Sequence, residues 1–343
     1  MMRTRPMLLA LGLALIAGDT RAQALFRDEA ALKLTITTNL RDLMRERDST
    51  ELRWFGAELG YAGEGGADTR VPVEIRARGH FRRQARNCAF PPLFLRASRA
   101  ARDSSILRGN PRLKIVTPCR PAVAEYQQYI LLEFLLYRTY SLVNEVHHRT
   151  RLIDVTYRDS TDRVKPITVT SFLLEIEDEV ADEHDLELVD LTGAVFEDVK
   201  PEVLNRLSLF EYWIGNTDWS LGALHNITLF RGPDGYVPVA YDFDWSGAVN
   251  ARYSFPQATL GIRTVRERLH RGPCRDVLQW APTIAHYQSI KPAVDSIWAM
   301  PVLGLDEKKR ADTKAYLDQL WPVLSDPRKF QRAVIDICQK VGN

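Results

Sequence analysis

The segment Ile214-Gly-Asn-Thr-Asp-Trp-Ser-Leu-Gly-Ala-Leu-His-Asn226, together with the segment Val239-Ala-Tyr-Asp-Phe-Asp-Trp-Ser-Gly247, decides the fold predicted for this chain. Two apolar runs lie between these segments, at residues 227–230 and 236–240, and Arg231-Gly-Pro-Asp-Gly235 separates them. Because Gly, Pro and Asp favour tight turns, the pattern predicts a β hairpin. A hairpin brings the polar side chains at its two ends together.

The side chains at the hairpin ends that form the candidate site are Asp218, Asn226, Asp242 and Asp244. Phosphoryl transfer needs a set of side chains of this kind. One carboxylate orients or deprotonates the attacking hydroxyl, and further oxygen atoms hold Mg²⁺ against the phosphates. The alternative is that these residues cap helices and turns, as Asp and Asn commonly do. Two polar clusters on either side of one hairpin favour the site.

The hydrophobic pattern around the hairpin divides the chain in two. After about residue 179 apolar residues recur at helical spacing, at residues 199–214, 275–281, 287–300, 307–320 and 327–340. From about residue 52 to 174 the pattern indicates mostly short strands, at residues 70–79, 93–96, 113–116, 152–157 and 167–174. One long apolar helix, residues 123–144, interrupts the strands. The sequence therefore predicts an α+β fold.

At the hairpin the chain resembles the CotH-type kinase-like family and, more distantly, the HipA-type kinases, which are relatives of the protein kinase fold. The resemblance implies a bilobal kinase-like fold, with a β-rich, nucleotide-binding N-terminal lobe at residues 25–178 and a helical C-terminal lobe at residues 179–343. It also implies that Asp218 is the catalytic base and that Asn226 and Asp242 are metal ligands. Asp244 stands where ordinary kinases have Gly, and it is a further candidate ligand.

The same resemblance assigns residues of the N-terminal lobe to the nucleotide: Arg76, Arg78, Lys114, Glu133 and Glu175. The strand residue Lys114 would hold phosphates, and Glu133 of the long helix would orient it. A buried glutamate needs a partner, and several arginines could serve in place of Lys114. Arg76 and Arg78 would lie beside the phosphates, and Glu175 would contact the adenine. The alternative is that each is an ordinary solvated residue of a strand or helix start.

Composition limits the possible partners. The 343 residues carry a net charge of +2, which argues against a dedicated nucleic-acid binder. The charge is uneven, since residues 70–120 contain 13 Lys or Arg and 2 acidic residues, whereas residues 171–200 contain 11 acidic residues and one Lys. Such charged runs usually form solvated faces or neutralise each other across the fold. The alternative is that the basic run faces a polyanion such as a nucleoside triphosphate.

The N-terminus has the pattern of a secretory leader. Arg3 and Arg5 precede an apolar run at residues 7–18, and Ala22-Gln23-Ala24 fits a cleavage site. We therefore expect residues 1–24 to be removed and the remaining chain to be exported, with an uncleaved anchor as the alternative. No later segment is long and apolar enough to predict a membrane span.

Export would place the four cysteines where disulfides persist, and four cysteines allow three pairings. Cys88 precedes one predicted strand and Cys119 follows another, so antiparallel strands would bring these two together. Cys274 and Cys338 would then join helical segments. No C-x-x-C pair indicates a zinc or redox motif.

The predicted function is that of a periplasmic or secreted kinase, which binds ATP with Mg²⁺ or Mn²⁺ and transfers the γ-phosphate to hydroxyl groups of a protein substrate. Nucleic acid is not expected as a partner. The alternative is a catalytically inactive, pseudokinase-like module with a binding or structural role in the envelope, which the scarcity of ATP outside the cytoplasm favours. A hydrolase is a third possibility, because Asp and Asn with a metal also activate water.

Overall fold

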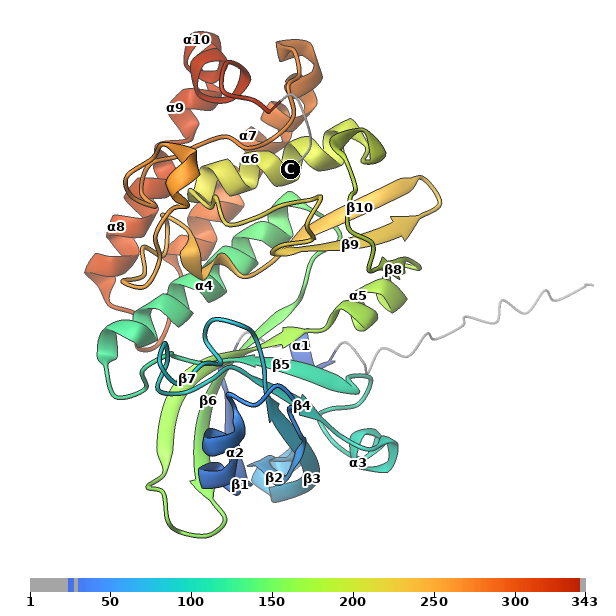
Figure 1. Cartoon of the computed structure of the whole chain (residues 1–343), viewed down its shortest axis with the longest axis vertical. Helices are drawn as coiled ribbons and strands as arrows, with labels where there is room; N and C mark the ends of the chain where they lie inside the picture. The colour runs from blue at the N-terminus through green and yellow to red at the C-terminus, as the bar shows by residue number, and fades with distance from the viewer. Residues whose placement is uncertain (1–23, 28–29, 340–343) are drawn as a thin grey trace, which may run out of the picture.

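The computed structural model describes residues 24–27 and 30–339 (Figure 1). The predicted leader, residues 1–24, lies outside the described residues except for Ala24. The described chain is α+β, with strands concentrated in the first half and helices in the second.

Seven strands form a closed barrel in the order β1-β2-β3-β4-β5-β7-β6. They are β1 (Leu32–Thr38), β2 (Phe55–Ala62), β3 (Asp68–Ala77), β4 (Leu93–Arg96), β5 (Arg112–Val116), β6 (Thr150–Asp159) and β7 (Ile167–Glu175). Alternate side chains point into the barrel, as for Leu34 and Ile36 of β1 and Val73 and Ile75 of β3, which are all buried. The residues between them are mostly polar and face outward, so one apolar core fills the barrel.

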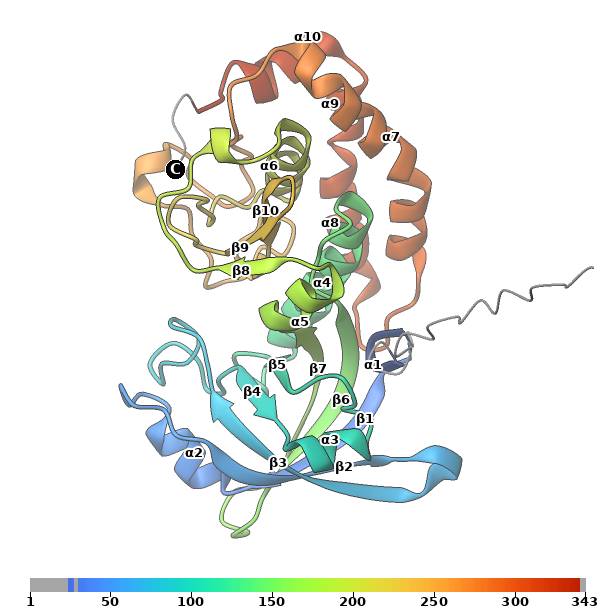
Figure 2. The ribbon, with the colours of Figure 1, turned by 90° about the vertical axis from the view of Figure 1, so that its right-hand side faces the viewer.

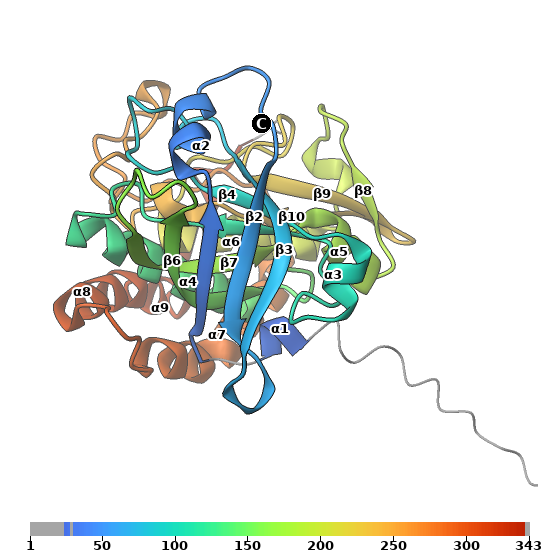
Figure 3. The same cartoon turned by 90° about the horizontal axis from the view of Figure 1, so that it is seen from below.

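The barrel overturns the predicted fold class. The bilobal kinase-like fold implied by the resemblance is wrong, because the strands form a closed seven-stranded barrel and not an open sheet. Closure depends on β1, which pairs antiparallel with β2 on one edge and parallel with β6 on the other. Figure 3 shows β1, β2 and β3 side by side when the molecule is seen from the barrel end. β1 precedes the region in which the pattern predicts strands.

The long helix α4 (Ala124–Val143) lies between the barrel and the other long helices (Figure 1). It is buried on nearly all sides, because Phe134 packs on Phe172 of β7 while other residues contact α6 (Pro201–Ile214). The predicted helix at residues 123–144 is confirmed. α4 therefore carries its one buried acidic residue, Glu133, into an apolar interface.

The remaining helices are α1 (Ala24–Arg27), α2 (Leu40–Glu46), α3 (Arg99–Asp103), α5 (Glu177–Glu183), α7 (Val277–Ala299), α8 (Glu307–Asp318), α9 (Trp321–Leu324) and α10 (Pro327–Phe330). The two helices predicted at residues 275–281 and 287–300 are in fact the single helix α7, which continues through Pro282 and Pro292. Its packing against α4 and α6 outweighs the hydrogen bonds that the two prolines remove (Figure 2).

A second, three-stranded sheet contains β8 (Glu187–Val189), β9 (Ile227–Gly232) and β10 (Gly235–Ala240), in the order β10-β9-β8. β9 and β10 form the predicted hairpin, with Ile227 opposite Ala240. β9 begins and β10 ends on the same side of this sheet. After β10 the chain continues into a short 3₁₀ turn, Phe243–Trp245. The polar segments before β9 and after β10 consequently lie next to each other.

Both predicted disulfides are confirmed: Cys88 is bonded to Cys119, and Cys274 is bonded to Cys338. The first bond joins the chain before β4 to the chain after β5, which are adjacent antiparallel strands. Disulfides of this kind fit an exported protein. Within the described residues, no helix has the length and hydropathy required to cross a membrane.

Candidate functional site

The loop that follows α6 has a fixed conformation. Gly215 ends the helix with a left-handed φ of 68°, and a Cβ there would lie 2.1 Å from the Tyr316 hydroxyl, so only glycine fits. Arg271 holds the next residues, because its Nη1 donates to the carbonyls of Thr217 at 2.6 Å and Trp219 at 2.7 Å. The loop therefore presents Asp218 in one orientation.

The Asp218 carboxylate makes two side-chain hydrogen bonds. Its Oδ1 lies 3.0 Å from Nε2 of His225, and its Oδ2 accepts a 3.2 Å bond from Nδ2 of Asn226, which also donates to the Asp218 carbonyl at 2.7 Å. The Asp218 side chain is 24% exposed and that of His225 is 53% exposed. The hydrogen bond to Asp218 raises the pKa of His225. The turn between Ser220 and His225 thus brings Asp218 and Asn226 together, and the sequence reasoning missed His225.

Asp242 lies at the same end of the hairpin, two residues after β10 ends at Ala240. Its backbone is left-handed, with φ 63°, and its N–H donates a 2.8 Å hydrogen bond to the Tyr137 hydroxyl of α4. A non-glycine residue in this region is strained, and the surrounding structure must hold it there. The neighbouring Tyr241 N–H bonds to the Asn226 carbonyl at 3.1 Å, which ties the two hairpin ends together.

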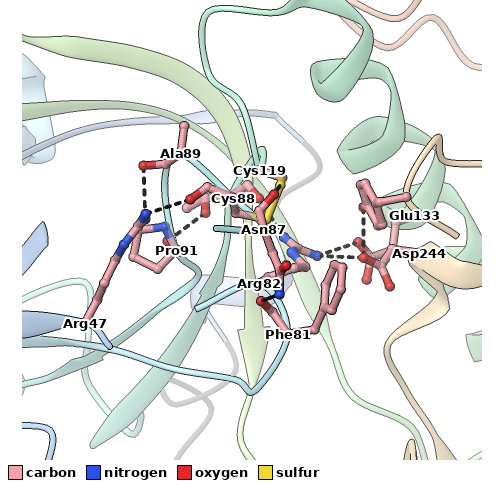
Figure 4. Close-up of a disulfide and its surroundings, with 12 residues drawn as sticks. Arg47, Phe81, Arg82, Asn87, Cys88, Ala89, Pro91, Cys119, Glu133 and Asp244 are labelled. Atoms are coloured by element: carbon pink, nitrogen blue, oxygen red, sulfur yellow. Dashed lines mark hydrogen bonds and ion pairs between the residues drawn. A yellow bond between two sulfur atoms is a disulfide. The ribbon is translucent and has the colours of Figure 1, made fainter. Parts of the chain in front are cut away.

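Behind Asp242 lies a buried group of two carboxylates and one guanidinium (Figure 4). Arg82, from the loop between β3 and β4, donates to Asp244 Oδ2 at 3.1 Å and lies 3.9 Å from Glu133 Oε2. Tyr253 also donates to Asp244, at 2.9 Å. Desolvation and the charge of Asp242 raise the pKa of Asp244 to about 6, although Arg82 opposes the rise.

Glu133 is the most unusual member of this group. It is 1% exposed, and neither of its side-chain oxygens accepts a hydrogen bond from any described residue. Desolvation and the nearby Asp244 raise its pKa well above the ordinary value for glutamate. Its cationic partner is Arg82 and not Lys114, so the kinase-like pair of Lys114 with Glu133 is wrong. The possibility that an arginine serves as the partner is confirmed.

Lys114 instead pairs with Glu177 at the start of α5. Burial lowers the pKa of Lys114, while the adjacent ammonium lowers the pKa of Glu177 to about 2 against the opposing effect of its own burial. Lys114 and Glu177 lie within ion-pair distance of each other. Together with the 2.9 Å pair of Arg112 and Asp178, this contact shows that the basic and acidic runs of the sequence neutralise each other in part.

The other predicted nucleotide residues are spread out. Arg78 is half-buried, its positive charge acts on Lys114 and Glu133, and it has no carboxylate partner among the described residues. Arg76 lies within β3, two residues before Arg78, and stacks on Trp54, 4.7 Å from the ring centre. Glu175 is buried and takes its hydrogen bonds from Arg149, so its side chain is not available to an adenine ring.

The fit of a divalent cation depends on oxygen ligands. Among the described residues, no group of three or more His, Cys, Asp or Glu side chains is arranged to hold a metal by itself. Mg²⁺ in nucleotide sites is commonly held by only one or two carboxylates together with phosphate oxygens. Asp242, half-buried and with no side-chain partner recorded among the described residues, fits such a role, whereas Asp244 is already bonded to Arg82 and Tyr253.

No family model matches the chain, and neither the curated proteins nor the solved structures contain a match to it.

Proposed function

We propose that the protein is an exported phosphotransferase, which binds a nucleoside triphosphate with a divalent cation and transfers the terminal phosphate to a hydroxyl group of a protein. The observation that carries the proposal is that two acidic segments meet at one end of the β9–β10 hairpin. Asn226 is hydrogen-bonded to Asp218, and its carbonyl accepts the N–H of Tyr241, the residue before Asp242. One carboxylate is partly exposed and oriented by Asn226, and the other is half-buried beside Arg78 and Lys114.

In this proposal Asp218 accepts the proton of the attacking hydroxyl. Asn226 fixes one carboxylate oxygen, and the partly exposed His225 can turn away from the other oxygen when a substrate arrives. A group held this way needs little reorganisation during the reaction, which is how general bases gain efficiency.

Asp242 would hold the cation, with the side-chain oxygen of Asn226 as the candidate second ligand. When bound, the cation would neutralise charge on the phosphates. Two positive side chains support the same role. Arg78 has no carboxylate partner among the described residues, and Lys114 lies close enough for Asp242 to affect its pKa.

An inactive nucleotide-binding module is the second candidate. It is favoured by the fact that Lys114 is already paired with Glu177 and that both carboxylate oxygens of Asp218 are hydrogen-bonded. A site of this kind would bind the nucleotide without transferring phosphate.

Thermal unfolding with and without nucleotide tests the shared part of both candidates. Addition of ATP with Mg²⁺ or Mn²⁺ at about 100 times its dissociation constant is expected to add about 2.7 kcal/mol to the free energy of unfolding. ATP with excess chelator is the control and is expected to stabilise much less. No stabilisation by ATP with either cation, at millimolar concentrations, would reject both candidates.

A further inference from the structure

A cavity of about 480 Å³ opens beside the Asp218 loop. The described residues that line it are Trp219, Ser220, Ala223, His225, Gln257 and Arg271. We propose that this cavity is the acceptor subsite and that it takes a peptide in which acidic residues flank a serine or threonine. The inference rests on the proposed phosphotransferase function and adds the chemical class of the acceptor.

The position of the cavity relative to Asp218 supports this assignment. His225 lines the cavity, and its Nε2 lies 3.0 Å from Oδ1 of Asp218. A hydroxyl group that enters from the cavity therefore meets the carboxylate after displacing one partly exposed imidazole. In the transfer, a bond forms between the acceptor oxygen and the terminal phosphorus while the bond from that phosphorus to the bridging oxygen breaks. The hydroxyl proton passes to Asp218, and the nucleoside diphosphate leaves.

The positive charge of the cavity wall favours an acidic acceptor peptide. Arg271 brings a permanent positive charge, and its orientation is fixed because Nη1 is bonded to two loop carbonyls. None of the six described lining residues is acidic. Since a guanidinium binds carboxylates well, acidic side chains next to the hydroxyl would complement this wall.

The size and polarity of the cavity fit one or two side chains. Its volume lies in the range of ordinary ligand sites, and its wall combines the hydroxyl of Ser220 and the amide of Gln257 with the ring of Trp219. A flexible peptide segment can place a hydroxyl and a neighbouring carboxylate in such a space.

Gln257 allows a test by charge exchange. Its side chain is exposed, and no described residue is recorded as its hydrogen-bond partner, so Gln257→Lys and Gln257→Glu are expected to fold normally. Fluorescence anisotropy would measure binding of a labelled acidic serine peptide and of its lysine-substituted analogue at low ionic strength. Wild type is expected to bind only the acidic peptide. Compared with wild type, Gln257→Lys is expected to bind the acidic peptide several-fold more tightly, and Gln257→Glu several-fold more weakly.

A second variant tests the cavity itself. Ala223→Trp fills the cavity and is expected to abolish peptide binding, whereas Ala311→Trp, on the exposed face of α8, is the matched control and is expected to have no effect. Equal affinity for the acidic peptide and its basic analogue, or unchanged affinity in Ala223→Trp, would overturn the proposal.

Nucleotide stabilisation, measured on the same samples, separates the two proposals. ATP-dependent stabilisation without peptide binding would reject the acceptor subsite and leave the phosphotransferase function standing. Peptide binding that depends on Gln257 and Ala223, without any effect of ATP, would support an acidic-peptide site and reject the phosphotransferase function.

Discussion

Asp242 is the residue whose placement demands the most explanation. It keeps a left-handed backbone at φ 63°, and its charge raises the pKa of the buried Asp244 and Glu133. Both features cost stability, so a binding role for the carboxylate would account for their presence. A cation bound at this position would offset the repulsion among the three carboxylates.

We therefore predict that Asp242→Asn abolishes the stabilisation by ATP with Mg²⁺ or Mn²⁺ and leaves the melting temperature without nucleotide equal to or slightly above that of wild type. Asparagine tolerates the left-handed backbone, and the substitution removes a charge that repels its neighbours. Thermal unfolding with and without nucleotide measures both effects.

Asp162 supplies the matched control for this experiment. It also has a left-handed backbone, with φ 53°, and is exposed in the turn between β6 and β7. Asp162→Asn is expected to retain full nucleotide stabilisation. If Asp242→Asn also retained it, Asp242 would not hold the cation, and strain alone would have to explain its conformation.

His148 predicts a pH dependence of stability. It is buried, and burial together with the charge of Lys114 lowers its pKa to about 3. Below pH 6.5 the unfolded chain gains a proton at this residue that the folded chain does not bind. The free energy of unfolding therefore falls as the pH drops from 6.5 toward 3, at about 1.4 kcal/mol per pH unit.

His148→Gln is expected to reduce this acid sensitivity. Glutamine can keep a hydrogen bond to the Glu175 carbonyl, which lies 3.1 Å from the histidine ring, but it does not titrate. The loss of unfolding free energy between pH 7 and pH 5 should be smaller in the variant by about 2 kcal/mol. Urea unfolding at the two pH values measures the difference, and an equal loss in both proteins would show that His148 is accessible to protons in the folded state.

Residue types were easier to predict from the sequence than their partners. The predicted hairpin placed Asn226 next to the segment after β10, but Asp218 reaches Asn226 through a separate turn at Ser220–His225 that was not predicted. The partner of Glu133 was not predictable in this way, since Arg82 comes from a loop 51 positions earlier that only the tertiary fold brings near α4. The sequence indicated only that a buried carboxylate needs a nearby cation, and not which cation that is.

At the scale of elements, the loop between β3 and β4 connects the barrel to the candidate site. The Cys88–Cys119 bond holds this loop, and Arg47 adds hydrogen bonds to the Cys88 and Ala89 carbonyls at 2.7 and 3.0 Å (Figure 4). From the same loop, Arg82 reaches Asp244. The disulfide therefore stabilises the segment that supplies the only cation bonded to Asp244 among the described residues.

Replacement of both Cys88 and Cys119 by alanine is expected to lower the free energy of unfolding by about 3.7 kcal/mol. The two cysteines are 31 residues apart, and opening a loop of this length frees the unfolded chain by roughly this amount. Urea unfolding under non-reducing conditions measures the change. A loss below about 1 kcal/mol would indicate that the hydrogen bonds of the loop hold it without the disulfide.

Elements with a strong local pattern were predictable, and those that depend on distant packing were not. α4 was found because its apolar residues recur at helical spacing without interruption by Gly or Pro. α7 was divided in two because local signals such as Pro282 end a helix, whereas Pro292 lay inside the second predicted helix. The contacts of α7 with α4 and α6 outweigh those signals, and no short window of sequence contains them.

At the scale of the whole molecule, the closure of the barrel was the feature that could not be predicted from the sequence. β1 alternates buried Leu34 and Ile36 with Lys33 and Thr35, so its strand pattern was present in the sequence. Its parallel pairing with β6, more than 100 residues away, was not, because only the complete fold brings those edges together. The strand list alone therefore predicted an α+β chain without distinguishing an open sheet from a closed barrel.

The position of the candidate site follows from this architecture. The chain just after β3 supplies Arg78, and β5 supplies Lys114. Helix α4 supplies Glu133 and Tyr137, and the segments that flank the hairpin supply the remaining acidic residues. Since these elements come from three regions of the chain, the site exists only in the folded molecule. In the proposed function, this assembly transfers phosphate with Asp218 as the base.

A comparison of wild type with Asp218→Asn tests the proposed phosphate transfer. The assay measures transfer of ³²P from [γ-³²P]ATP to protein in the presence of Mg²⁺ or Mn²⁺. Acidic serine peptides and envelope extracts would serve as acceptors. The proposed role of Asp218 predicts measurable transfer by wild type and a decrease by orders of magnitude in the variant, with nucleotide-dependent stabilisation nearly unchanged, because the carboxylate acts mainly in the transition state. Transfer by Asp218→Asn at the wild-type rate, or no transfer by a wild-type protein that binds ATP, would contradict it.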